Sequence, residues 1–153
     1  MDELRVVVIT PNQQLLEELE LYCSFLASPV MKLWQKGKEL FRREGTLHYP
    51  ASLSLETMLE LQVADDPQQV YILDIDAYSL DDLNRVFIQL DSELVILYEA
   101  NGHLQLMELD AKLDVVINRT TNLTLLRKPL VRLELEIAIS SIMKKRTKVS
   151  RTR

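Results

Sequence analysis

Cysteine, histidine and glycine are scarce in this sequence, and each shortage excludes a class of site. The 153 residues include one cysteine, Cys23, so neither an internal disulfide nor a cysteine-rich zinc site can form. The two histidines, His48 and His103, lie far apart in the chain and supply a metal site poorly. Three glycines form neither a P-loop nor a Gly-x-Gly-x-x-Gly turn. We therefore expect no bound metal and no cofactor.

Long apolar runs are also missing. No stretch approaches the roughly 18 apolar residues of a membrane-spanning helix, and the first residues lack the apolar core of a signal peptide. Together with the single cysteine, these features predict a cytoplasmic protein that does not enter a membrane. The content of 47% hydrophobic and 27% charged residues is typical of a globular domain with one core.

Basic residues are unevenly distributed along the chain. Six of the 18 lie beyond Met143, where there is no acid: Lys144, Lys145, Arg146, Lys148, Arg151 and Arg153. The body, residues 1–143, is left with 12 basic and 23 acidic residues, a net charge of −11. A nucleic-acid coat on the body is therefore excluded, because such affinity comes mostly from Lys and Arg. We predict a folded domain over 1–143 and a disordered or linker tail over 144–153, where weak contact with DNA or an acidic partner is expected.

Short apolar runs alternate with amphipathic segments along the body. We predict strands at 4–10, 47–53, 69–75, 93–99 and either 114–118 or 123–127. We predict helices at 11–27, 28–46, 55–63, 81–90, 103–112 and from 129 onward. In the first of these, Thr10 is the expected N-cap and Pro11 the first helical residue. The basic helix at 28–46 is either a solvated helix packed by Trp34 or a surface for a membrane or an acidic partner.

This alternation predicts an α/β fold with an open parallel sheet and helices on both faces. Five strands in a compact domain most often follow the flavodoxin-like order 2-1-3-4-5, with 28–46 as an extra helical insertion.

The segment Val70-Tyr-Ile-Leu-Asp74-Ile-Asp76 resembles the third strand of receiver domains of bacterial response regulators. In that family the strand ends in the aspartate that accepts a phosphoryl group, which corresponds to Asp74. Asp114-Val-Val-Ile-Asn118, after Lys112, resembles receivers attached to LytTR-type DNA-binding domains. Alternatively, Lys128-Pro129 matches the family's switch lysine and the proline that follows it.

Other positions depart from the receiver pattern. Phosphoryl transfer to a carboxylate needs a divalent cation, which the family holds with paired acids after the first strand. Here those positions read Thr10-Pro11-Asn12. The family has a hydroxyl residue at the end of the fourth strand. In this sequence that position is occupied by Tyr98 or Glu99. We expect Asp74 to be a vestigial phosphoacceptor and Asp76 and Glu99 to form an acidic pocket beside it.

The last helix carries two apolar stripes on nearly opposite sides. Val131, Leu135, Ala138, Ile139 and Ile142 form one stripe. The second stripe consists of Leu130, Leu133 and Ile137. One stripe suffices to cover a sheet, so the second is expected to be buried by a homodimer partner or by the segment 123–126. Receivers commonly pair through their fourth helix, fifth strand and fifth helix, which agrees with a homodimer.

These observations predict a receiver-like module that is not an enzyme. It acts independently of phosphorylation, in protein interaction and dimerisation within bacterial signal transduction or transcription regulation, with a protein partner or an output domain. Two alternatives stay open. One is a response-regulator receiver phosphorylated on Asp74. The other is an acidic α/β binding domain unrelated to two-component signalling, which shares only the architecture.

Overall fold

A computed structural model describes residues 3–27, 50, 52–58, 61, 66, 68–86, 92–99, 102–120 and 122–151. Its strands, in chain order, are β1 (Glu3–Ile9), β2 (Ser52–Met58), β3 (Gln69–Asp74), β4 (Glu93–Tyr98) and β5 (Leu123–Arg127). Its helices are α1 (Gln13–Ala27), the 3₁₀ helix η1 (Ile75–Ala77), α3 (Leu80–Val86), α4 (His103–Ile117) and α5 (Arg132–Arg151). The predicted insertion at 28–46 lies outside the described residues.

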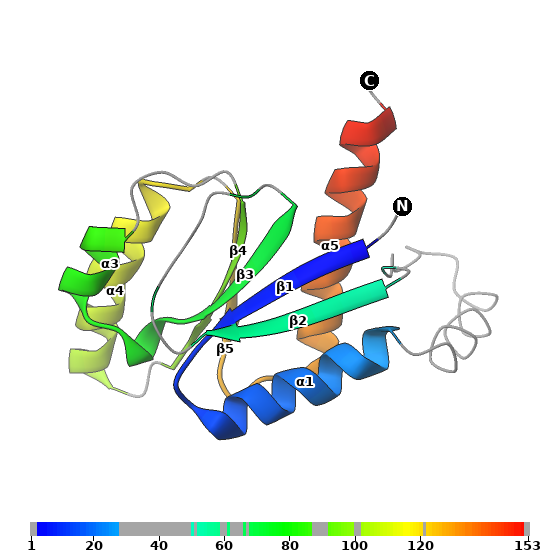
Figure 1. The fold of residues 1–153 in the computed structure, drawn as a ribbon. Helices are drawn as coiled ribbons and strands as arrows, with labels where there is room; N and C mark the ends of the chain where they lie inside the picture. The colour runs from blue at the N-terminus through cyan, green and yellow to red at the C-terminus, as the bar shows by residue number, and fades with distance from the viewer. Residues whose placement is uncertain are drawn as a thin grey trace.

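The five strands form one parallel sheet in the order β2-β1-β3-β4-β5 (Figure 1). This is the flavodoxin-like arrangement predicted from the sequence, so the predicted fold class is confirmed. The inner strands β1, β3 and β4 are nearly continuous apolar runs because both of their faces are covered. Their carboxyl ends lie at one edge of the sheet, where polar side chains collect.

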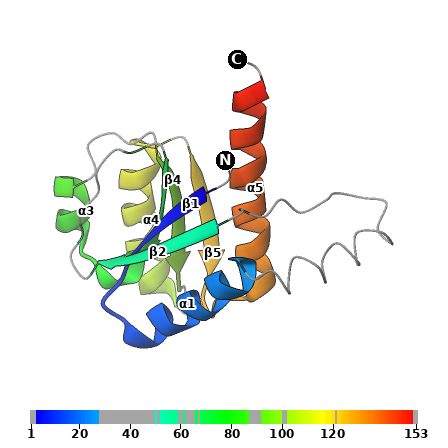
Figure 2. The same cartoon turned by 45° about the vertical axis from the view of Figure 1, so that its right-hand side comes forward.

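The sheet separates two apolar layers. Alternate residues of β1 point to opposite faces, so Val6 and Val8 belong to one layer and Val7 and Ile9 to the other. The first layer is completed by α1 and α5, and the second by α3 and α4. Figures 1 and 2 show these two helix pairs on opposite sides of the sheet. Both layers contain fully buried side chains, among them Leu135 and Ile96.

The second strand corrects two sequence predictions. We expected a strand over 47–53 and a helix from Leu55, but β2 runs from Ser52 to Met58 and pairs with β1 along its length. Its residues Ser-Leu-Ser-Leu-Glu-Thr-Met alternate between the two faces, and pairing with β1 satisfies backbone groups that a short isolated helix leaves open. β2 lies at an edge of the sheet.

The fifth strand is 123–127. The other candidate, 114–118, belongs mostly to α4, which continues to Ile117. Its β-branched residues look like a strand locally, but Leu109 and Val116, seven residues apart, lie on one helical face and are both buried. β5 pairs with β4 in register Leu97↔Leu126, which places Lys128 just beyond the carboxyl edge.

The last helix begins at Arg132, three residues after the predicted start at Pro129, and continues to Arg151. Residues 144–151 are therefore helical rather than disordered. The last buried residues of the helix are Ile142 and Met143, among those whose side chains are described. Among the helices of the described residues, none is long and apolar enough to cross a membrane.

Candidate functional site

Three side chains meet at the carboxyl edge of the sheet although they are far apart in the sequence. Thr10 follows β1, Asp74 ends β3 and Lys128 follows β5. Backbone hydrogen bonds extend the pairing past the strands, from Thr10 N to Met58 O (3.2 Å) and from Lys128 N to Tyr98 O (2.7 Å). The sheet thus fixes the backbone positions of these residues at its carboxyl edge.

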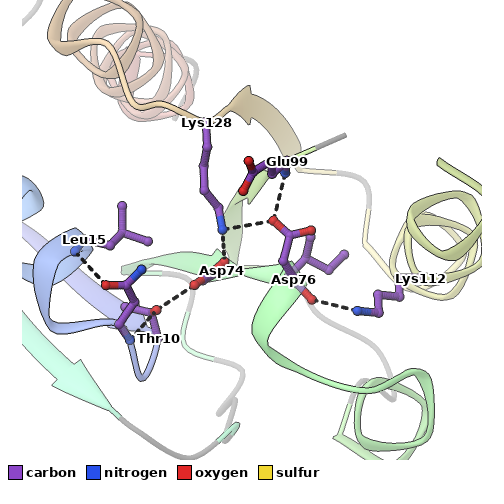
Figure 3. A network of polar contacts seen from close by, with 9 residues as sticks. Thr10, Leu15, Asp74, Asp76, Glu99, Lys112 and Lys128 are labelled. Atoms are coloured by element: carbon purple, nitrogen blue, oxygen red, sulfur yellow. Dashed lines mark hydrogen bonds and ion pairs between the residues drawn. The ribbon is translucent and has the colours of Figure 1, made fainter. Parts of the chain in front are cut away.

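Both carboxylate oxygens of Asp74 have partners (Figure 3). The hydroxyl of Thr10 donates to Oδ2 at 2.7 Å, and the ammonium of Lys128 binds Oδ1. The Asp74 side chain is 5% exposed and that of Lys128 is 18% exposed, so little water competes with the pair. Asp74 is a buried, neutralised carboxylate.

The Lys128 ammonium bridges two acids. It also lies 2.9 Å from Oδ2 of Asp76, which in turn accepts a hydrogen bond from the backbone N–H of Glu99 at 2.8 Å. Burial by itself lowers the pKa of Lys128, but the hydrogen bonds and charges of Asp74 and Asp76 outweigh it, and the net effect raises the pKa above its usual value. Lys128 is therefore a cation at neutral pH. The pKa of Tyr78 is also raised, first by burial and then by the charge of Asp74.

The Thr10 hydroxyl does not have its predicted role. Instead of capping α1, it donates to Asp74 and accepts the N–H of Asn12 at 3.1 Å. The cap is Asn12, whose Oδ1 accepts from the N–H groups of Gln14 (3.1 Å) and Leu15 (3.3 Å). The sequence contained this signal, because Asn is a preferred capping residue and directly precedes the amphipathic stretch.

The predicted acidic residues line a pocket beside the Asp74–Lys128 pair. The pocket has a volume of about 130 Å³ and is lined by Asp76, Glu99, Gln105, Glu108, Leu109 and Lys112. Asp74 is not among these residues. The Lys112 ammonium donates to the carbonyl of Ile75 at 3.3 Å and so ties α4 to η1. Of the two lysines considered for the family's switch position, Lys128 is the one that reaches Asp74.

The residues around Asp74 do not fit a receiver's magnesium site. Between Asp74 and Asp76, where a cation can bridge two carboxylates, lies the Lys128 ammonium. Thr10, Pro11 and Asn12 bring no negative charge at the end of β1. Within the described ranges, no group of three or more His, Cys, Asp or Glu residues is arranged to hold a metal ion.

The remaining sequence candidates lie elsewhere. Cys23 is 3% exposed in the core under α1, and burial raises the pKa of its thiol to about 12. His48 and the side chain of His103 lie outside the described part of the chain.

The structure divides the three predicted dimer residues. Leu130 precedes α5 and is buried in the core, so the prediction that it belongs to the second stripe is wrong. Leu133 and Ile137 are 55% and 50% exposed. Val131, which we predicted to face the sheet, is 49% exposed. Leu133 and Ile137 are one turn apart and form the exposed α5 stripe.

The basic tail is described only in part. Lys144, Lys145 and Arg146 lie in the last turns of α5. The side chains of Lys148 and Arg151 and the whole of Arg153 fall outside the described residues.

Comparisons with protein-family models, with curated proteins and with solved structures find no match for this chain.

The hydroxyl of Thr10 is expected to stabilise the fold through Asp74. Thr10→Val keeps the shape of a fully buried side chain but leaves Oδ2 of Asp74 without this donor. We expect a loss of about 1.5–3 kcal/mol in the free energy of unfolding, measured by urea denaturation, because hydrogen bonds to charged groups lie in this range. Thr10→Ser retains the hydroxyl and is expected to lose less than half as much. Equal losses in the two variants would show that packing, not the hydrogen bond, is responsible.

Proposed function

We propose that the protein is a receiver-like interaction and dimerisation module that works without phosphorylation, in bacterial signal transduction or transcription regulation. The observation that carries the proposal is the Lys128 ammonium bound to both Asp74 and Asp76. The chain itself supplies the cation between these two carboxylates, so this position holds an ammonium rather than an added ion. We place the module in the cytoplasm, where its single buried thiol, Cys23, stays reduced.

Attack of Asp74 on a phosphodonor is disfavoured by its surroundings. The attacking oxygen has to give up either the Thr10 hydroxyl or the Lys128 ammonium, and the carboxylate is almost inaccessible to solvent. A phosphoryl group would also bring further negative charge toward Asp76, without the acids that hold a compensating divalent cation at the end of β1. We infer that Asp74 has a structural role.

The test is to treat the protein with acetyl phosphate and Mg²⁺ and then to measure its intact mass. We expect no adduct of about 80 Da, the mass of one phosphoryl group on a carboxylate nucleophile. Asp74→Asn, treated in parallel, shows the background from other sites. An adduct on the unchanged protein that is missing from Asp74→Asn would overturn the proposal.

That outcome would support the second candidate function, a working receiver phosphorylated on Asp74. The observation in its favour is that two positions match the receiver pattern, a buried aspartate at the end of β3 and a lysine directly after β5. It differs from the first proposal only in the chemistry at Asp74.

Dimerisation is proposed to use the exposed α5 stripe. Leu133 and Ile137 each leave about half of the side chain in solvent, on a helix whose opposite side fills the core. Apolar groups on adjacent turns bury each other when two copies of the helix pair, and the effect favours association in proportion to the area covered.

Light scattering at tens of micromolar is expected to give twice the 17.7 kDa chain mass. Ile137→Asp is expected to give a monomer, because pairing would bury an unpaired carboxylate. Leu80→Asp is the matched control, since Leu80 is 37% exposed on α3, which packs on the opposite face of the sheet and lies outside the surface of α4, β5 and α5, and its variant should stay dimeric. A monomer mass for the unchanged protein would end the dimer proposal.

A further inference from the structure

The end of α5 reaches the edge of the sheet opposite to Asp74. Its 20 residues extend about 30 Å, whereas the six residues of β4 extend about 20 Å, so the helix is longer than the strands it covers. Figures 1 and 2 show its last turns beyond the sheet, at the end where β1 starts. The basic segment Lys144–Arg146 therefore lies at the amino edge of the sheet.

Two of its cations are held by groups at this edge. The Lys145 ammonium lies 3.5 Å from Oε1 of Glu93, the first residue of β4. The Arg146 guanidinium donates to the carbonyl of Gln68, just before β3, at 2.9 Å. These contacts join residues more than 50 positions apart in the chain.

One acceptor is a backbone carbonyl, that of Gln68, and the other is the largely buried side chain of Glu93. The Glu93 side chain is 12% exposed, and its second oxygen, Oε2, is buried with no hydrogen-bond partner in the described part of the structure. Asp66 fixes the backbone beside it, because its side chain accepts the N–H of Gln68 at 3.0 Å and its carbonyl accepts the hydroxyl of Ser92 at 2.6 Å. The edge thus presents preorganised negative charge to the helix end.

Burial lowers the pKa of Arg146, while the charges of Glu93 and Asp66 act in the opposite direction. Both acids are therefore close enough to Arg146 to act on its charge. The body has a net charge of −11, and the basic segment supplies the cations that contact with a phosphate polyanion requires.

We propose that the amino edge is an autoinhibitory docking site for the basic segment: Glu93 and the Gln68 carbonyl hold Lys145 and Arg146 and compete with the phosphates of a nucleic acid for these two cations. Because Glu93 and Gln68 belong to the same chain, they compete with DNA phosphates at a fixed effective concentration. This competition reduces the apparent affinity of the basic segment for DNA. This inference does not depend on the chemistry at Asp74 or on the exposed α5 stripe.

The test uses Glu93→Gln in the full chain, with two measurements. Loss of a partly exposed ion pair corresponds to at most about a fivefold change in an equilibrium. We expect backbone amides of residues 144–151 to exchange hydrogen up to about fivefold faster, and a short labelled DNA duplex at low salt to bind tighter by a similar factor. Asp110→Asn removes the same charge from an exposed position on α4 and serves as the matched control.

The outcomes separate the parts of the proposal. If Glu93→Gln and Asp110→Asn show the same exchange and the same DNA affinity, the edge does not hold the segment and the proposal fails. Faster exchange in Glu93→Gln with no DNA binding by any variant also overturns it, because there is then no ligand for the contacts to oppose. Lys145→Met provides a second check on folding, since it breaks the same ion pair from the helix side and should speed exchange alike. None of these results bears on phosphorylation or dimerisation.

Discussion

Lys128→Met is expected to lower the free energy of unfolding by about 3–5 kcal/mol, the range found when one partner of a buried ion pair is removed. Methionine preserves most of the volume of the lysine stem but leaves Asp74 as a buried carboxylate without its cation, and leaves Asp76 beside it. The two neighbouring carboxylates repel each other, and the burial of Asp74 prevents water from compensating for the lost cation. Urea denaturation at pH 7 measures the loss.

The matched control removes the acid as well. Asp74→Asn in the Lys128→Met background takes away the uncompensated charge while keeping the shape of the side chain. We expect the double variant to recover most of the lost stability, because neutral replacements of a buried pair are often tolerated. The Asp74→Asn single variant completes the comparison. If the stability lost by the double variant equals the sum of the losses of the two single variants, Lys128 and Asp74 are not energetically coupled. The main support for the proposed function is then gone.

The same pair predicts a pH dependence. The folded pKa of Lys128 lies above its ordinary value of 10.5. A raised folded pKa means that the contribution to stability is complete below about 10.5 and is lost as the pH rises through the folded value. The stability difference between the unchanged protein and Lys128→Met should therefore be constant from pH 7 to 10 and should shrink only at higher pH.

Cys23 is expected to react with a disulfide reagent about a thousandfold more slowly at pH 8 than a free cysteine. Its thiol pKa is raised from 9.0 to about 12 by burial, which lowers the fraction of reactive thiolate by about three powers of ten. The measurement is the labelling rate with and without denaturing urea, in which the thiol should behave as an ordinary cysteine. Native labelling within about tenfold of the free rate would show that the thiol is not buried as described.

The raised pKa of Cys23 also predicts how the stability of the protein changes with pH. Because the folded value is higher than the unfolded one, the neutral thiol contributes fully below pH 9.0, and this contribution declines as the pH rises from 9.0 toward about 12. Cys23→Ala should therefore show a shallower loss of stability than the unchanged protein over that range.

Much of the fold was predictable because its strongest signals are local. The runs that became β1, β3 and β4 are apolar, β-branched and short, and such runs favour buried parallel strands wherever they occur. The errors arose where local signals conflict. Ser52–Met58 was divided between a strand and a helix, and Asp114–Ile117 resembled a strand but lies in α4. In both segments, pairing or packing with distant residues decided the outcome.

By itself, the sequence determined the α/β fold, the position of Asp74 at the end of a strand and the shortage of acids at Thr10–Asn12. These features depend on residue type and short-range periodicity. The tertiary structure decided that Lys128, 54 residues from Asp74, binds it, that Leu130 is buried and that Glu93 receives the basic end of α5. Such contacts depend on the order in which the crossover connections place the strands in the sheet. That order brings together residues that are far apart in the sequence, and their separation in the sequence does not predict their distance in space.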